Sequence, residues 1–228
     1  METSLHRQLK RLYAGAESRQ EVRVGRWRID AVVRGRLVEV QLGSLAAIRG
    51  KVQALLSEHR LLVVKPIVVG KQLIKLDGRG RVVSERPSPK RGTLLDAFDE
   101  LVYFTQVFPH PNLTLELPLV EIVERRSPGH GRRRRWRQDD FVVEDQELVA
   151  IAGQRRLRTT ADLVRLLPAR PTGEFDTAEL AQALGVRRFV AQRIAYCLRT
   201  MGAVATRGKR GRAWLYCWTD GADGRQAA

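Results

Sequence analysis

Two acidic residues on a predicted β-hairpin form the strongest candidate for a chemical site. Asp30 and Glu39 lie in neighbouring strand-like runs that are joined by Arg34-Gly35, a two-residue hairpin signal. Counting back from this turn sets Asp30 opposite Glu39, with β-carbons roughly 4.5–5.5 Å apart. Two carboxylates this close repel each other unless a cation lies between them. The pattern therefore predicts a site for a divalent ion with oxygen ligands, most simply Mg²⁺.

A structural interpretation of the same hairpin stays open. Strand alternation places apolar side chains such as Ile29 and Val38 on one face, which is core, and the two acids on the other. In this interpretation the polar face is solvated, and Asp30 and Glu39 pair with Arg28. The hairpin then has no chemical role.

The elements that must position the acid pair form a compact series along the chain. A helix is expected over residues 4–14, three strands over 21–24, 27–33 and 36–42, a helix over 44–59 that Ser44 caps, and a buried central strand over 61–69. A hairpin at 73–76 and 81–83, a helix near 94–102 and a strand near 113–123 complete this domain.

A known superfamily resembles this arrangement. Asp30, followed nine residues later by Glu39-Val40-Gln41 on a strand that leads into a helix, looks like the motif of the PD-(D/E)xK phosphodiesterases. The order helix–strand–strand–strand–helix–strand resembles their core. The resemblance implies an α+β protein with a restriction-endonuclease-like α/β core, a mixed central sheet flanked by helices. It also implies that Asp30, Glu39 and the carbonyl of Val40 bind Mg²⁺, with Mn²⁺ as an alternative ion.

The sequence departs from the superfamily at the third site residue. That residue is usually a lysine that positions the attacking water, whereas here it is Gln41, which carries no charge. Lys51 in the next helix or Lys65 further along could replace the lysine. The superfamily often adds an acid from the opening helix or first strand, for which Glu17 and Glu21 are the candidates. The expected catalytic residues are Asp30, Glu39, Gln41 and Lys51.

The C-terminal part resembles a winged helix-turn-helix. Thr159 with Asp162 and Asp176 with Glu179 are capping-box patterns that begin two helices, a third helix is expected over 187–201, and strands over 203–206 and 213–218 follow. Arg and Gln can read base edges in the major groove, and a basic wing suits the phosphate backbone. The expected DNA-binding residues are Arg188, Gln192, Arg193, Tyr196 and Arg199 on the third helix, Arg207, Lys209, Arg210 and Arg212 in the wing, and Arg132, Arg133, Arg134 and Arg135 in the linker.

Charge supports a polyanionic partner. The chain has 41 Lys and Arg against 25 Asp and Glu, a formal net charge of +16. Because winged helices also bind proteins, an adaptor role is an alternative. The four histidines, His6, His59, His110 and His130, show no metal-ligand or triad spacing.

Other classes are excluded by what the sequence lacks. No apolar stretch approaches the roughly 18–20 residues of a membrane span, and no basic-then-apolar leader is present. Two cysteines, Cys197 and Cys217, supply neither a disulfide framework nor a four-ligand zinc site. We therefore expect a cytoplasmic protein that binds DNA and no membrane, and a homodimer is compatible with the sequence.

These observations predict a domain order and a function. We expect a nuclease-like domain over 1–125, a basic linker over 126–139, a winged helix over 140–220 and a disordered tail over 221–228. The whole chain resembles uncharacterised bacterial proteins of this architecture. The expected function is Mg²⁺-dependent phosphodiester hydrolysis on DNA, as a DNA endonuclease. The alternative is a non-catalytic DNA-binding regulator or adaptor with an inactive nuclease-like fold.

Overall fold

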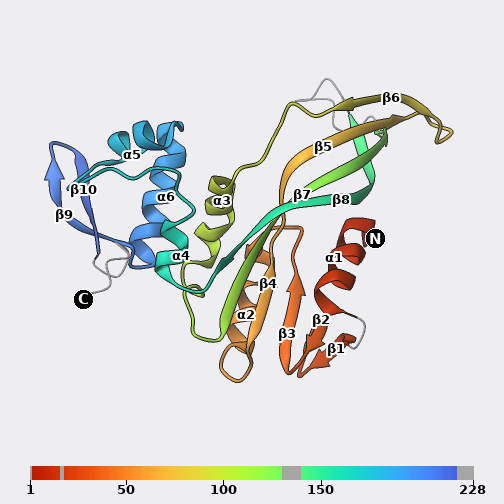
Figure 1. Ribbon diagram of the computed structural model, residues 1–228, viewed down its shortest axis with the longest axis horizontal. Helices are drawn as coiled ribbons and strands as arrows, with labels where there is room; N and C mark the ends of the chain where they lie inside the picture. Colours follow the sequence, from red (N-terminus) through yellow and green to blue (C-terminus); the bar gives the residue numbers. More distant parts are fainter. Residues whose placement is uncertain (1, 16–17, 130–139, 220–228) are drawn as a thin grey trace. The chain divides into compact units, whose positions relative to one another are not determined.

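The protein is an α+β molecule, seen here in a computed structural model that describes residues 2–15, 18–129 and 140–219 (Figure 1). An eight-stranded mixed sheet has the order β1-β2-β3-β4-β7-β5-β6, with β8 paired to β7. The chain divides into two units. The first unit is Met1–Leu42, Val64–Thr93 and Leu117–Arg155, and the second unit is Gly43–Val63, Leu94–Glu116 and Arg156–Ala228.

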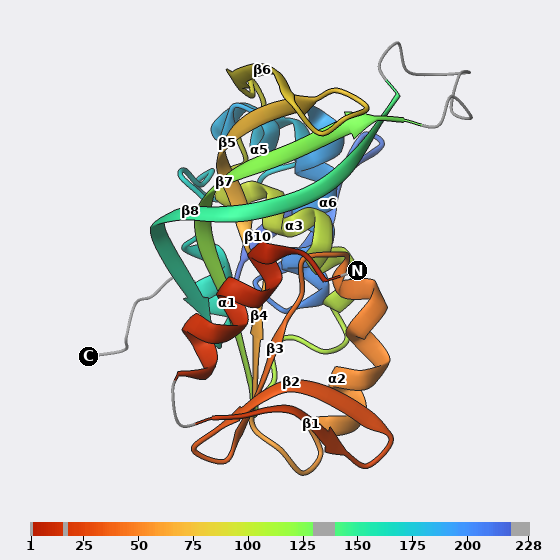
Figure 2. The ribbon, with the colours of Figure 1, turned by 90° about the vertical axis from the view of Figure 1, so that its right-hand side faces the viewer.

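The opening helix and hairpins follow the expected order. Helix α1 (Ser4–Ala14) begins at Thr3, whose side chain accepts from the His6 amide, and it packs on β2 and β3 (Figure 2). Strands β1 (Arg19–Val24), β2 (Trp27–Val33) and β3 (Arg36–Val40) form an antiparallel meander.

The β2–β3 turn has the expected conformation and sets the expected register. Arg34 and Gly35 both have positive φ, 49° and 75°, as a two-residue turn of this kind requires. Val33 pairs with Arg36 and Ala31 with Val38, which confirms the predicted register over these residues.

The apolar run 61–69 forms two strands, where one was expected. Strand β4 (Leu61–Val64) ends before Lys65-Pro66, and β5 (Ile67–Leu76) begins after it. Pro66 has no backbone N–H to donate, which explains why the ladder breaks there. Strand β5 runs parallel to β7 and antiparallel to the edge strand β6 (Val82–Pro87).

Two long strands extend the sheet beyond the expected elements. Strand β7 (Leu113–Pro128) includes Arg125 and Arg126, and β8 (Phe141–Leu157), which pairs with β7, was not predicted at all. Asp145 of β8 accepts hydrogen bonds from the backbone N and the hydroxyl of Ser4 at 2.8 and 2.5 Å. The Leu148 amide donates to the side chain of Gln8 at 2.8 Å, so β8 is bonded to the first half of helix α1.

The expected domain borders stay predictions. Strand β8 bears on the border that was expected at residue 140. Strand β8 lies in the range expected for the winged helix, yet it pairs with β7 of the large sheet. The tail at 221–228 lies outside the described residues.

The second unit has a core rich in phenylalanine. The helix expected over 44–59 is a 3₁₀ turn, η1 (Leu45–Ile48), followed by α2 (Arg49–Leu55), with Ser44 as the cap. The helix near 94–102 is likewise split into η2 (Leu94–Asp96), α3 (Ala97–Leu101) and η3 (Val102–Phe104). Phe98, Phe104 and Phe108 are fully buried.

The C-terminal module has the element order helix, helix, helix, strand, strand. Both predicted capping boxes are present and begin α4 (Thr160–Val164) and α5 (Thr177–Leu184). Gly185, with φ 63°, ends α5 in the left-handed conformation. Helix α6 (Arg188–Thr200) leads to the antiparallel pair β9 (Val204–Arg210) and β10 (Ala213–Trp218).

Candidate functional site

A histidine of α1 lies against the predicted acid site. His6 Nε2 is 2.9 Å from the Val40 carbonyl oxygen and 3.5 Å from Asp30 Oδ2. The Val40 amide donates to the same Oδ2 atom at 2.8 Å. On the other side of its ring, His6 Nδ1 is 2.6 Å from Glu2 Oε1. An imidazole, a carboxylate and a backbone carbonyl, two of which sequence reasoning had paired, therefore converge at the end of the β2–β3 ladder.

The Asp30 carboxylate is also close to a lysine. Lys10 Nζ lies 3.7 Å from Asp30 Oδ1 and 3.1 Å from Glu2, and it forms an ion pair with Glu21. Burial alone would raise the pKa of Asp30, but hydrogen bonds from His6 and the Val40 amide, with the charges of His6 and Lys10, lower it. Asp30 is therefore an anion whose charge two cationic side chains balance.

His6 is protonated in this arrangement. Its hydrogen bond with Asp30 raises the pKa of the imidazole to about 9, against the opposing effect of burial. The protonated ring donates through Nε2 towards Val40 and Asp30 and through Nδ1 to Glu2. A positive charge therefore lies where the sequence predicts a metal ion.

The groups at this site are donors that a divalent ion would need once His6 loses its proton. A carboxylate and a backbone carbonyl are the oxygen ligands that Mg²⁺ prefers, and the neutral imidazole Nε2 would be a nitrogen ligand beside them. Glu2 on Nδ1 is the carboxylate partner that orients a metal-binding histidine in many sites.

Such an ion would need a backbone ligand. Among the residues that the structure describes, no group of three or more His, Cys, Asp and Glu side chains could hold a metal ion. His6 and Asp30 supply two side chains, and the carbonyl of Val40 supplies the third donor atom.

The structure places the other predicted site residues as follows. Glu39 is buried, on the strand that also carries Val40, and Gln41 lies just past the end of that strand. Lys65 is buried, and its ammonium donates to the carbonyl of Leu42 at 3.0 Å, one residue beyond Gln41. Of the two candidate replacement lysines, Lys65 therefore lies beside Gln41 in the first unit, whereas Lys51 lies on α2 of the second unit.

The additional acids proposed for the site are Glu21 and Glu17, and the arginine of the structural interpretation is Arg28. Glu21 forms ion pairs with Lys10 and, at 2.5 Å, with Arg28. The arginine that the structural interpretation assigned to Asp30 and Glu39 is thus engaged with Glu21. Glu17 lies outside the described residues.

Sequence reasoning missed the contribution of α1 to this site. His6 and Lys10 are four residues apart and share one face of α1, and Glu2, four residues before His6, precedes the helix cap Thr3. Lys10 is buried, which is rare for a lysine unless it is paired. A polar stripe at this spacing beside the buried Leu5 and Leu9 is the signal that could have identified the site.

The predicted DNA-binding face of α6 is largely exposed. Arg188, Gln192, Tyr196 and Arg199 are exposed, while Ala191, Ile194, Ala195, Cys197 and Leu198 are buried. Arg193 is half-buried and forms an ion pair with Asp99 of α3. The carbonyl of the preceding residue, Phe98, is 3.8 Å from Cys197 Sγ.

The wing residues are exposed but have distinct neighbours. Arg210 binds Glu179 of α5 at 2.9 Å, and Arg207 Nε is 3.0 Å from Cys217 Sγ. Lys209 Nζ lies 4.6 Å from the centre of the Trp214 ring. Arg212 is exposed in the turn that follows Arg210.

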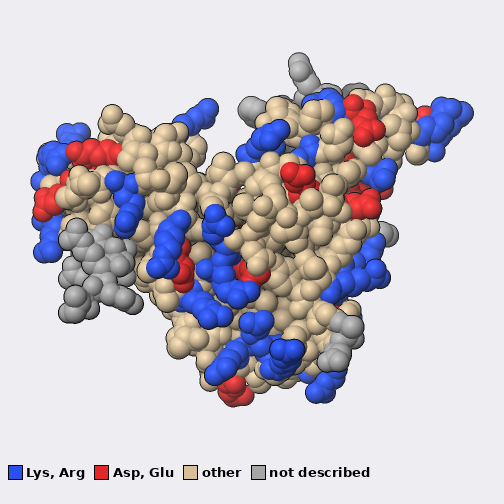
Figure 3. Space-filling model, in the orientation of Figure 1, with Lys and Arg blue, Asp and Glu red and all other residues tan. Residues whose placement is uncertain are grey.

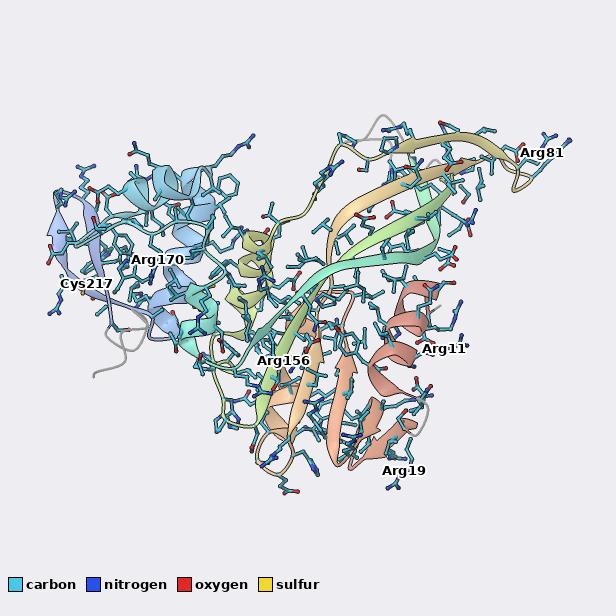
Figure 4. All side chains as sticks on the ribbon, in the orientation of Figure 1. Arg11, Arg19, Arg81, Arg156, Arg170 and Cys217 are labelled. Atoms are coloured by element: carbon cyan, nitrogen blue, oxygen red, sulfur yellow. The ribbon has the colours of Figure 1, made fainter. Side chains whose placement is uncertain are left out.

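Basic residues also lie outside α6 and the β9–β10 turn. Arg132, Arg133, Arg134 and Arg135 lie outside the described residues. Figure 3 shows Lys and Arg side chains spread over the face in view. Figure 4 places Arg81 at the tip of the β5–β6 hairpin and Cys217 on β10. No helix in the described ranges has both the length and the apolar composition to span a membrane.

Comparison with known proteins adds relatives but no activity. A family model described as "Domain of unknown function (DUF8091)" matches residues 3–158, which end one residue after β8. An uncharacterised protein of Treponema pallidum (strain Nichols) is 30% identical over 218 residues, covering 94% of this chain and 84% of the relative. No solved structure matches the chain.

Proposed function

This chain belongs to the DUF8091 family, and we propose that it is a DNA-binding protein that hydrolyses phosphodiester bonds with Mg²⁺. The observation that carries the proposal is the convergence of His6 Nε2, Asp30 and the Val40 carbonyl, with Glu39 on the same strand as Val40. The order α1-β1-β2-β3-α2-β4, which matches the PD-(D/E)xK core order, also supports it. The C-terminal module is proposed to be a winged helix that supplies DNA affinity.

Each site residue has a role in this proposal. Asp30, the Val40 carbonyl and His6 would hold the ion, Glu39 would be the further carboxylate, and Glu2 would orient the imidazole of His6. When bound, Mg²⁺ activates a water molecule and stabilises negative charge on the phosphate. Gln41 offers an amide that can orient this water, and the Lys65 ammonium, bound to the carbonyl next to Gln41, keeps positive charge nearby.

Metal binding must displace a proton from His6. A metal-bound imidazole is unprotonated, whereas His6 without metal has a pKa of about 9. We therefore predict that Mg²⁺ binding at pH 7 releases close to one proton. Titration calorimetry in two buffers of different ionisation enthalpy measures this release. A His6→Asn variant that still binds Mg²⁺ with the same proton release would contradict the prediction.

The test of the proposed function is cleavage of labelled DNA by the full chain. Duplex, single-stranded and branched DNA are incubated with Mg²⁺, Mn²⁺ or EDTA. We expect metal-dependent cutting that is lost in Asp30→Asn and in Glu39→Gln and kept in Asp77→Asn, whose carboxylate lies in the β5–β6 turn. Cutting that survives in both site variants, or in EDTA, would refute the assignment.

A second function is favoured by a specific observation. Gln41 replaces the usual lysine, and His6 and Lys10 already balance the charge of Asp30 without a metal. The fold would then bind DNA without cutting it, as a regulator or adaptor. Equal DNA affinity of the wild type and Asp30→Asn, with no product in any metal, is the result expected for this alternative.

A further inference from the structure

The exposed aromatic side chains of this protein gather in one unit. Among the described residues, the large exposed aromatics are Tyr103, Phe189, Tyr196 and Trp214, with exposures of 48, 53, 43 and 51%. All four belong to the second unit, whereas the exposed large apolar residues of the first unit are aliphatic. Exposed rings are costly in water, so their concentration in the unit that contains α6 and the wing points to a ligand.

Two of these rings share the outer face of α6. Phe189 and Tyr196 are seven residues apart, which is two helical turns, so they lie on the same side of the helix with Gln192 between them. Arg188 is exposed beside Phe189, and the guanidinium of Arg199 is 6.0 Å from the centre of the Tyr196 ring. The face therefore alternates rings with cations and an amide.

The third ring extends from the wing. Trp214 on β10 pairs in register with Lys209 on β9, whose ammonium lies 4.6 Å from the ring centre. Two other aromatics of β10, Tyr216 and Trp218, pack on Phe175 with ring centres 6.1 and 5.1 Å away. The core thus uses those two rings, while Trp214 is left exposed next to a cation.

The chemistry of these groups selects among nucleic-acid ligands. A contact to phosphates alone needs cations and no rings, and a continuous duplex presents base edges and thymine methyl groups in its grooves. The flat face of a base is accessible only when that base is unpaired, and aromatic rings beside a basic surface are the platform on which such bases stack.

We propose that Phe189, Tyr196 and Trp214 stack on unpaired bases, so that the second unit binds single-stranded DNA or the single-stranded part of a junction. This inference rests on the proposed DNA-binding function and names its substrate class. The neighbouring Arg188, Arg199 and Lys209 contact the phosphates of the same strand.

The experiment separates bases from phosphates. Anisotropy titrations in EDTA compare the full chain on a single strand, a hairpin duplex and a strand of equal charge whose sugars carry no bases. We expect the single strand to bind more tightly than the other two. Phe189→Ala and Trp214→Ala should each weaken single-strand binding by roughly 5- to 150-fold and leave the base-free strand unchanged.

Conservative and matched variants keep the test independent of folding. Phe189→Tyr and Trp214→Phe keep an aromatic ring and should retain most of the affinity. Val149→Ala removes a side chain that is 61% exposed in the first unit and should change nothing. Tightest binding to the duplex, or equal losses on the single strand and the base-free strand, would overturn the inference while leaving DNA binding intact. Absence of binding to all three DNAs would instead refute the proposed function itself.

Discussion

His6 is the residue whose protonation distinguishes the two proposed functions. As an imidazolium it balances Asp30 and caps the Val40 carbonyl, and as a neutral ring it offers Nε2 to a metal ion. In the structure these groups form an internal ion pair, and in the proposed nuclease they would form the metal site instead. The proton and the ion would then compete for one position.

The stability of the protein should fall as pH rises through the range set by His6. The pKa of His6 is about 9 in the folded protein and near 6.5 when unfolded. Its contribution is therefore fully present below about pH 6.5 and is lost by about pH 9. We predict a loss on the order of 2 kcal/mol, because partial exposure of the ring reduces the full effect.

Urea unfolding in EDTA at several pH values measures this loss. His6→Asn should remove the pH dependence over this range, whereas His59→Asn, in the second unit, should retain it. An unchanged profile in His6→Asn would show that His6 is not the titrating group.

At the scale of elements, a buried glutamate joins three strands of the large sheet. Glu124 on β7 is 2% exposed and binds Lys71 of β5 at 2.5 Å, Gln146 of β8 at 2.8 Å and Arg126 of its own strand at 2.7 Å. Burial alone would raise the pKa of Glu124, but these hydrogen bonds and the Lys71 charge lower it. The carboxylate is the common acceptor of the group.

Loss of this charge should destabilise the first unit. Glu124→Gln leaves Lys71 and Arg126 without their anion, and breaking a buried ion pair in this way costs about 3 kcal/mol. The neighbouring exposed residue offers a control, since Glu121→Gln on the same strand should change stability by less than about 0.5 kcal/mol. The unfolding midpoints of the two variants in denaturant measure this difference in stability. Equal midpoints would contradict a structural role for Glu124.

Elements differ in how well the sequence predicts them. Helix α1, β2, α5 and β10 are close to their expected bounds because each has a cap, a turn signal or a clear apolar period. Strand β8 escaped prediction because its residues are mostly exposed or half-buried, without a regular alternation. The prediction of one strand over 61–69 was wrong, because it followed the apolar composition of the run and neglected the break that Pro66 causes.

The candidate site was predictable only in part. The hairpin turn fixes the register of β2 against β3 from Val33–Arg36 back to Ala31–Val38, and this local rule is readable from the sequence. His6 and Lys10 reach the same place because α1 packs on β2 and β3, and that packing depends on contacts between distant segments. Local sequence patterns do not encode such contacts, so the spacing of the histidines along the chain gave no sign that His6 belongs to the site.

At the scale of the whole molecule, the net charge of +16 sets how DNA affinity should respond to salt. If six or more phosphates of a single strand are contacted, raising salt from 50 to 200 mM should weaken binding by roughly 300-fold or more. Lys209→Gln should reduce the slope of log affinity against log salt by about 0.7. Anisotropy titrations at four salt concentrations measure the slope.

A surface arginine provides the control for this experiment. Arg165 is exposed, directly follows α4 and forms an ion pair with Asp162. Arg165→Gln therefore removes one positive charge that is not among the predicted DNA-binding residues. Its slope should match the wild type. A slope that changes equally in both variants would mean that net charge, and not the wing, governs the affinity.

The bonds between α1 and β8 set an order for the assembly of the first unit on the ribosome. Ser4 and Gln8 have their partners in Asp145 and Leu148, 141 and 140 residues later. The helix that carries His6 and Lys10 is therefore synthesised well before these anchors, which emerge only after about 140 further residues have been made. A shortened protein that ends at residue 125, the expected border of the nuclease-like domain, would lack both anchors. We therefore expect this truncation to loosen the contact of α1 with Asp30 and Val40.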